Sequence, residues 1–232
     1  MFAGKMKAVT FSFDDGVTQD KRLIEIFDKY GLKCTFNINS ELLGKAGSLI
    51  IGDVTVAHVK PRPQEIKEIY KNHEVAVHTL THPNLTTLDD AEVIRQVETD
   101  RKNLTEYVGY EVCGMAYPCG GVNNDERVAE LIKKNSGVKY SRTITSTHNF
   151  DLQDNLYQFN PSVYILETDK MWEMAEEFLK LQTDTPKLFY IWGHAYEFDI
   201  DNSWQKFDDF CRFISNRDDI FYGTNSEVLL NK

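Results

Sequence analysis

The sequence predicts an α/β fold in which a parallel sheet covered by helices closes into a barrel. Strand-like and helix-like segments alternate along nearly the whole chain, which is the pattern of a parallel sheet with helices outside it. No linker, internal repeat or low-complexity segment divides the 232 residues, so we expect a single domain spanning residues 1–232. About seven β-then-α units favour a closed barrel over the competing layout, an open doubly wound sheet.

The expected strands are short segments rich in β-branched and aromatic residues, bounded by turn residues. The first, residues 7–13 (KAVTFSF), ends at the turn sequence Asp14-Asp15-Gly16. Residues 187–192 (KLFYIW) have the continuous apolar character of a strand buried on both faces. The expected strands are residues 7–13, 34–38, 74–78, 114–117, 138–142, 187–192 and 220–222.

The expected helices lie between these strands and are marked by residues typical of helix ends. Thr18 is a candidate N-cap and Gly31 a candidate C-terminal stop for the first helix. The longest helix, residues 88–107, has Thr87 as candidate N-cap and Gly109 after its end. Residues 39–60 are expected to form a long connection. The expected helices are residues 19–30, 63–71, 88–107, 124–135, 171–181 and 203–214.

The charge of the chain narrows the range of partners. The formal net charge is −10, and a strongly acidic surface repels nucleic acid and anionic membranes. We therefore expect no nucleic-acid partner and no membrane partner, and a neutral or cationic substrate. The sequence does not specify an oligomeric state.

The cysteines and the beginning of the chain indicate a reducing compartment. Four cysteines are scattered without CxxC spacing, so free thiols are expected. No signal peptide is visible near the first residues, and no apolar stretch is long enough to span a membrane. We expect a cytoplasmic protein.

Polar residues gather at the carboxyl ends of the expected strands, where functional groups of parallel α/β folds meet. Asp14 and Asp15 follow the first strand, and His78 and His82 lie at the end of the third. Alone, the first pair also fits a plain turn, and the second also fits two histidines in a polar loop. Together, one carboxylate and two neutral imidazoles suit zinc with an open position for water. A divalent cation would also relieve repulsion between adjacent carboxylates.

The four other histidines of the chain have simpler interpretations. His194 follows an apolar strand and is either a core histidine or a general acid. His58, His73 and His148 lie in loops or beside charged residues and are interpreted as solvated.

Four short motifs resemble the polysaccharide deacetylases, also called carbohydrate esterase family four. They are residues 12–16 (SFDDG), 78–82 (HTLTH), 117–120 (YPCG) and 191–194 (IWGH), in the order seen in that family. The resemblance spans residues 7–194 and implies a distorted (β/α) barrel of about seven parallel strands. It also implies an acetylated oligo- or polysaccharide substrate and one divalent metal ion, with Zn expected and Co, Ni or Mn as alternatives.

The resemblance implies a role for each motif residue. Asp14 would be the general base and His194 the general acid, while Asp15, His78 and His82 would bind the metal. The backbone N–H of Cys119, just after Pro118, would help to form an oxyanion hole. Exposed aromatic residues near the strand ends, together with Pro118, would contact the sugar or the acetyl group; these are Tyr117, Trp192 and Tyr196.

Three departures from the family pattern suggest a divergent branch. Ala116 stands where the family usually has an arginine that orients the base, Cys119 replaces an aromatic residue, and Trp192 replaces a small aliphatic one. Arg142 ends the next strand at the same rim, so we predict that it has taken over the role of the missing arginine. The alternative is that Arg142 pairs with a surface carboxylate.

The expected reaction is hydrolysis of an N- or O-linked acetyl group, because the same residues serve either linkage. Two alternatives stay open. One is hydrolysis of a non-sugar amide on the same scaffold. The other is a catalytically inactive carbohydrate-binding protein, which the five intact polar motif residues argue against and the missing arginine mildly favours.

Overall fold

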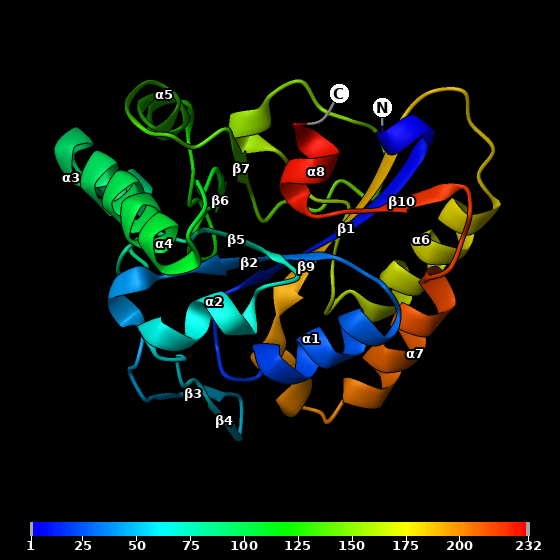
Figure 1. Ribbon diagram of the computed structural model, residues 1–232, viewed down its shortest axis with the longest axis horizontal. Helices are drawn as coiled ribbons and strands as arrows, with labels where there is room; N and C mark the ends of the chain where they lie inside the picture. Colours follow the sequence, from blue (N-terminus) through cyan, green and yellow to red (C-terminus); the bar gives the residue numbers. More distant parts are fainter. Residues whose placement is uncertain (1, 231–232) are drawn as a thin grey trace.

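The main sheet of the protein is parallel and strongly curled. A computed structural model describes residues 2–230 and is shown in Figure 1. Within that range the main sheet has eight strands; seven follow the order β7-β6-β5-β2-β1-β9-β8, and β10 pairs with the first part of β1. The strands are β1 (Lys7–Asp14), β2 (Cys34–Ile38), β5 (Glu74–Val77), β6 (Gly114–Ala116), β7 (Tyr140–Arg142), β8 (Val163–Tyr164), β9 (Lys187–His194) and β10 (Ile220–Tyr222).

The strand order identifies the barrel and excludes the doubly wound layout. Strands β1, β2, β5, β6 and β7 lie side by side in chain order, β8 pairs with β9, and β9 returns to pair with β1. A doubly wound sheet would instead reverse its order at a switch point. The curled half-barrel is open between β7 and β8, where a single parallel bridge joins Arg142 to Phe159. The expected distorted barrel of about seven parallel strands is thus confirmed.

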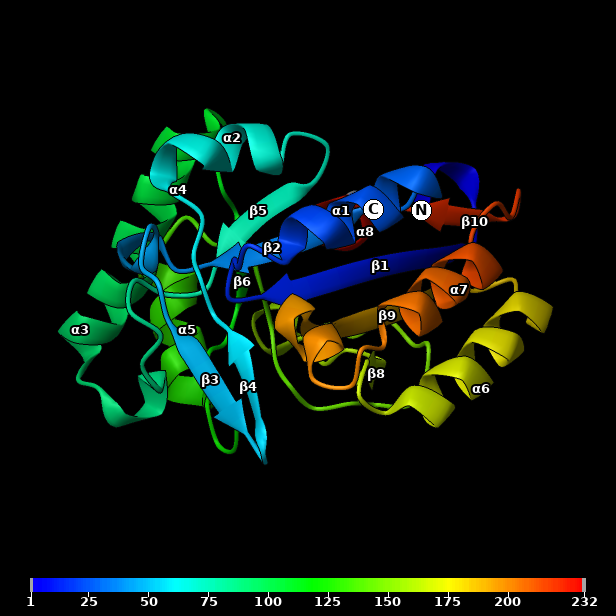
Figure 2. The same cartoon turned by 90° about the horizontal axis from the view of Figure 1, so that it is seen from below.

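Helices cover the outside of the curled sheet (Figures 1 and 2). None of the helices described is long and apolar enough to cross a membrane. The helices are α1 (Asp20–Lys29), α2 (Ile66–Ile69), α3 (Asp90–Ile94), α4 (Asp100–Val108), α5 (Glu126–Asn135), α6 (Thr168–Lys180), α7 (Trp204–Ile214) and α8 (Asn225–Leu229).

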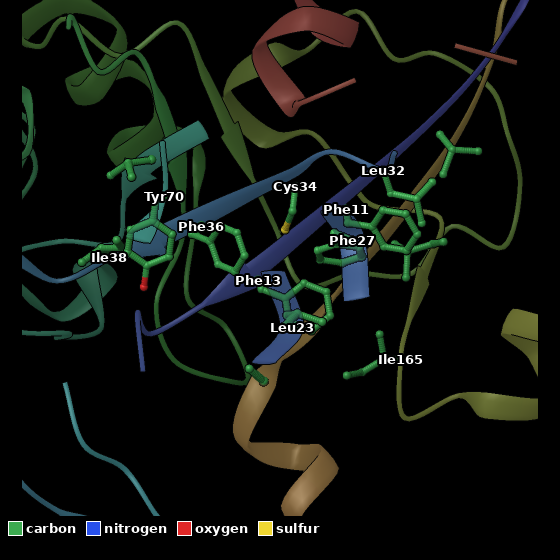
Figure 3. Close-up of a cluster of buried hydrophobic side chains, with 14 of the residues drawn as sticks. Phe11, Phe13, Leu23, Phe27, Leu32, Cys34, Phe36, Ile38, Tyr70 and Ile165 are labelled. Carbon is green, nitrogen blue, oxygen red and sulfur yellow. The ribbon is translucent and has the colours of Figure 1, made fainter. Parts of the chain in front are cut away.

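Strand β1 shows why the core and the site lie on opposite faces of the sheet. Alternate side chains of a strand point to opposite faces. Phe11 and Phe13 pack outward against Phe27 of α1 and Phe207 of α7. Phe11, Phe13 and Phe27 are labelled in Figure 3. From Thr10 onward, the even-numbered side chains of β1 point into the barrel, where they are buried and polar; these are Thr10, Ser12 and Asp14. The inner face of β1 therefore carries a row of buried polar side chains that ends at Asp14.

Several expected element boundaries differ from the structure. The expected long helix is α3 and α4 joined by a π-helical segment, η5 (Arg95–Thr99), and its N-cap is Asp89 rather than Thr87. Thr18 does not cap α1, which begins one residue after Gln19 without a side-chain cap. A helical hydrophobic period cannot distinguish an α-helix from one that contains a π turn, because both bury nearly the same face.

Three short elements were not expected from the sequence. The connection 39–60 contains an antiparallel hairpin of β3 (Ser48–Ile51) and β4 (Val54–Ala57). Strand β8 has two residues and α8 five, too few for a periodic pattern. Four free cysteines, as expected, are present among the described residues; the compartment stays a prediction.

Candidate active site

The ladder of hydrogen bonds around β1 fixes the relative positions of the strand-end residues. Asp14 is in register with Asn37 of β2 on one side and with His194 of β9 on the other. These are neighbouring strands of one sheet, so backbone pairing alone brings a carboxylate and an imidazole to the same rim. The loop after β5 carries His78 and His82 to this rim.

Asp15, His78 and His82 form a cluster that fits a metal ion. One ligand atom from each lies within 4.8 Å of the others. Asp15 Oδ1 is 3.9 Å from His78 Nε2 and 3.5 Å from His82 Nε2. One carboxylate oxygen and two imidazole nitrogens are a donor set that suits zinc and neighbouring divalent ions.

The environment of the two histidines keeps them neutral, as metal ligands must be. Burial lowers the pKa of His78 to about 4, and burial also lowers the pKa of His82. His78 Nδ1 lies 2.9 Å from the carbonyl oxygen of Ala116. Since a carbonyl can only accept, Nδ1 carries the proton, and Nε2 is left free to bind a cation.

The loop that bears the histidines is held by buried polar groups of the helix behind it. Asp100 accepts hydrogen bonds from the backbone N–H groups of Ser40 and His78, at 2.7 and 3.1 Å. The backbone carbonyl oxygen of Gln96, within η5, accepts a hydrogen bond from the Leu80 N–H at 3.0 Å. A π turn frees backbone groups from the regular helix ladder, so the irregularity of this helix supplies an anchor for the loop.

Left-handed backbone conformations occur at the turns that form the site. Among the described non-glycine residues with positive φ are Asp15 (79°), Thr79 (68°), His82 (64°) and Cys119 (69°). Such residues are held in place only when the surrounding structure determines them strongly, and they cluster at functional sites.

Asp14 is buried and paired with Arg142. The Arg142 guanidinium donates to both carboxylate oxygens, at 2.5 Å for Oδ1, and Asn37 Nδ2 donates to Oδ1 at 2.8 Å. Burial alone would raise the pKa of Asp14, but the charges of Arg142, His78 and His194 outweigh it and hold that pKa below its ordinary value. The expected contact between Arg142 and Asp14 is therefore present, and Arg142 does not pair with a surface carboxylate.

His194 is oriented by a buried glutamate three residues further on. Its Nδ1 is 3.1 Å from Glu197 Oε1, and its backbone N–H donates to Glu197 Oε2 at 3.0 Å. Tyr164 also donates its hydroxyl to Glu197. Burial alone would lower the pKa of His194, but Glu197 and the nearby aspartates raise it to about 9. A protonated imidazole at neutral pH is able to donate a proton.

A cavity of about 490 Å³ joins these groups. It is lined by Asp15, His78 and His82, by Asp14 and by His194, and its walls are mainly aromatic; the wall residues are Tyr117, Cys119, Gly120, Ile144, Tyr164, Trp192 and Tyr196. Pro118 is buried and is not part of the wall. The expectation that the aromatic residues are exposed is wrong, since Tyr117, Trp192 and Tyr196 are 0%, 5% and 8% exposed. They shape a pocket rather than an open platform.

A family model described as polysaccharide deacetylase matches residues 3–140, more than half of the chain. The chain belongs to the polysaccharide deacetylase family.

Solved structures with similar folds agree with this assignment. The carbohydrate esterase domain of a multidomain xylanase from the hindgut metagenome of Trinervitermes trinervoides is 14% identical, with a TM-score of 0.61 over 97% of this chain and 90% of that chain. The Bc1960 peptidoglycan N-acetylglucosamine deacetylase is 14% identical, with a TM-score of 0.59 over 98% and 89%. A family 4 carbohydrate esterase from Streptomyces lividans, in complex with acetate, is 12% identical, with a TM-score of 0.54 over 91% and 88%. At these identities the likeness concerns the fold.

The three departures of this deacetylase-family chain have structural counterparts. Ala116 supplies its carbonyl to His78, and Arg142 contacts Asp14. Trp192 stacks on Tyr164, with ring centroids 4.3 Å apart, and the Arg142 guanidinium lies 4.5 Å from the centre of its ring. Cys119 Sγ is 3.8 Å from His82 Nδ1.

Sequence reasoning missed several residues of the site. His58 was interpreted as solvated, but its Nε2 is 3.2 Å from Asp15 Oδ2 and its side chain is 19% exposed. His73 was also interpreted as solvated, yet it is buried and accepts from the Cys34 N–H at 3.2 Å. Glu197 had a detectable signal, because it lies three residues after His194. His58 had none, because its contact depends on the unexpected hairpin.

Proposed function

We propose that the protein is a metal-dependent hydrolase that removes acetyl groups, N- or O-linked, from a carbohydrate. The observation that carries this proposal is that a carboxylate, Asp14, and an imidazole with a raised pKa, His194, line the same cavity as the three-ligand cluster. A base and an acid that share one cavity are what hydrolysis of an acyl bond requires.

The proposed ligands are Asp15, His78 and His82, and zinc suits them, with Co, Ni or Mn as alternatives. When bound, a divalent ion would polarise the acyl carbonyl and acidify a water molecule in the cavity.

The residues of the site are proposed to transfer protons, stabilise the oxyanion and contact the substrate. Asp14 takes a proton from the attacking water, and Arg142 keeps that carboxylate ionised and oriented. The backbone N–H of Cys119, at the cavity wall, is proposed to donate to the developing oxyanion. His194, held by Glu197, gives a proton to the leaving amine or alcohol. The aromatic residues Tyr117, Trp192 and Tyr196 exclude water and contact the acetyl group or the sugar ring.

The alternatives differ from this proposal in measurable ways. An inactive carbohydrate-binding protein would not need a buried arginine on its base, and the Arg142–Asp14 pair argues against it. A hydrolase of non-sugar amides would use the same residues, and only its substrates would differ.

The deciding experiment is acetate release from acetylated xylan, chitin and peptidoglycan fragments, alongside simple acetamides. We expect release from at least one carbohydrate, loss of release with EDTA, and recovery with added zinc or cobalt. Release from acetamides alone would favour the non-sugar amidase. Metal binding without release from any substrate would favour the binding protein.

A further inference from the structure

The segment that follows the hairpin β3–β4, residues 58–60, contacts Asp15 of the three-ligand cluster. Backbone hydrogen bonds join the His58 N–H to Gly47 at 2.8 Å and the Lys60 N–H to Lys45 at 2.9 Å. The Thr18 N–H donates to Val59 at 2.8 Å. This segment is therefore tied both to its own hairpin and to the chain just after Asp15.

The two oxygens of the Asp15 carboxylate face different neighbours. Its Oδ1 faces the two expected imidazole ligands, at 3.9 and 3.5 Å. Its Oδ2 accepts a hydrogen bond from His58 Nε2 at 3.2 Å. A carboxylate that binds a metal through one oxygen is fixed in rotation when the other oxygen is hydrogen-bonded, and such outer partners typically change metal affinity 10- to 100-fold when they are removed.

The backbone of Asp15 is held from the same segment. Lys60 is 5% exposed and donates its ammonium group to the Asp15 carbonyl. Asp15 has a φ of 79°, a conformation that a non-glycine residue keeps only with such support. Lys60 thus supports the turn, and its ammonium group also lies 3.8 Å from Asp15 Oδ1, whereas His58 is hydrogen-bonded to the other carboxylate oxygen.

The ring of His58 has a second neighbour in the cavity wall. It packs edge-on against Tyr196, with ring centroids 5.3 Å apart and an interplanar angle of 81°. This contact fixes the plane of the imidazole and directs Nε2 toward Asp15. Strand β4 itself packs against η7 (Ala195–Asp199), the segment that carries Tyr196.

We infer that His58 is a positioning residue for the metal site, which orients the Asp15 carboxylate and so raises the affinity of the protein for its divalent ion. The inference rests on the proposed function, because it requires that Asp15, His78 and His82 bind that ion. It assigns a role in metal binding to the hairpin, a part of the chain outside all four sequence motifs.

The test separates the hydrogen bond of His58 from its packing. His58→Phe keeps a ring against Tyr196 but removes the donor, whereas His58→Gln retains a donor of similar reach. His148→Gln is the matched control, because His148 is an exposed histidine paired with Glu167 and away from the cavity. Each protein is stripped with a chelator and titrated with Co²⁺, and the dissociation constant is obtained from the visible absorption of the bound ion.

We expect His58→Phe to weaken Co²⁺ binding about 10- to 100-fold, His58→Gln to stay within about threefold of the wild type, and His148→Gln to be unchanged. Thermal unfolding of each metal-free variant checks that the fold is kept, and His58→Ala replaces His58→Phe if the latter is not folded. Wild-type affinity in the phenylalanine or alanine variant would overturn the inference alone. A wild-type protein that binds no Co²⁺ would overturn the proposed function as well.

Discussion

Arg142 follows Asp14 by 128 residues in the chain, yet its guanidinium binds both oxygens of that carboxylate. Arg142 is 0% exposed, so the pair is shielded from water. Removing one partner of a buried ion pair leaves an uncompensated charge. The position of this arginine, on the strand next to the one that carries Ala116, was predictable because parallel strands end at one rim.

Arg142→Ala should lower turnover by roughly 100-fold, at the lower end of the range of about 10²- to 10⁴-fold that a general base contributes, because Asp14 loses its cationic partner. The same change should lower the free energy of unfolding by about 3–5 kcal/mol. Metal content should not change, since Arg142 contacts none of the three ligands in the described structure. Steady-state kinetics, chemical denaturation and metal analysis give the three quantities. Full activity in this variant would mean that Asp14 needs no cationic partner.

Glu197 is expected to set the alkaline limit of activity. His194 must be protonated to act as an acid, and its pKa of about 9 keeps it so at neutral pH. Glu197→Gln removes the negative charge that raises this pKa, so the alkaline limb of kcat/KM should move to lower pH. Glu173→Gln, an exposed change on α6, is the control. An alkaline limb that does not move would show that another group sets it.

At the scale of elements, the helix formed by α3, η5 and α4 holds the loop that carries His78 and His82. The hydrophobic pattern predicted one long helix over residues 88–107 and could not show the π turn within it. That turn places Gln96 and Asp100 where they bind the backbone of the histidine loop. Hydrophobic periodicity specifies which face of a helix is buried, but not which backbone groups leave the helix ladder.

Asp100→Ala should destabilise the protein by about 1–3 kcal/mol, because the buried Ser40 N–H loses its carboxylate acceptor, whereas the His78 N–H keeps its hydrogen bond to the Ile38 carbonyl. It should also weaken metal binding, since His78 begins the loop. Asp169→Ala, an exposed change in the first turn of α6, should do neither. Denaturant unfolding and the Co²⁺ titration measure the two effects. Unchanged metal affinity would mean that the loop is fixed by its other contacts.

At the scale of the whole molecule, the two ends of the barrel are sealed differently. The carboxyl ends of the strands surround the cavity, while the amino ends are closed by α8. Buried Glu74 accepts from Thr35 Oγ1 at 2.7 Å, from the Tyr140 hydroxyl at 3.0 Å and from the Ser226 N–H at 3.0 Å. The alternation of segments was enough to predict the barrel. The position of α8 could not be predicted, because a helix of five residues shows no hydrophobic period and because the partners of Glu74 are far from it in the sequence.

Glu74→Ala should therefore reduce stability without disturbing the site. We expect a loss of about 2–4 kcal/mol in the free energy of unfolding, because the hydroxyl of Tyr140 and the N–H of Ser226 lose a buried acceptor. Metal affinity and KM should stay at their wild-type values, because Glu74 lies at the opposite ends of the strands. Glu177→Ala, exposed on α6, controls for loss of charge. A parallel loss of metal affinity would show that the two ends are coupled.

The left-handed backbone at Asp15, Thr79, His82 and Cys119 has a consequence for how this chain can change. Each such residue costs about 1–3 kcal/mol, a cost that glycine largely avoids. Selection for heat resistance alone should therefore favour glycine at Thr79 and Cys119, whereas selection for turnover should retain a side chain that restricts the turn. In a mutant library, the two selections should therefore enrich different residues at Thr79 and Cys119. Heat resistance and turnover would then make opposite demands on the same turns of the site.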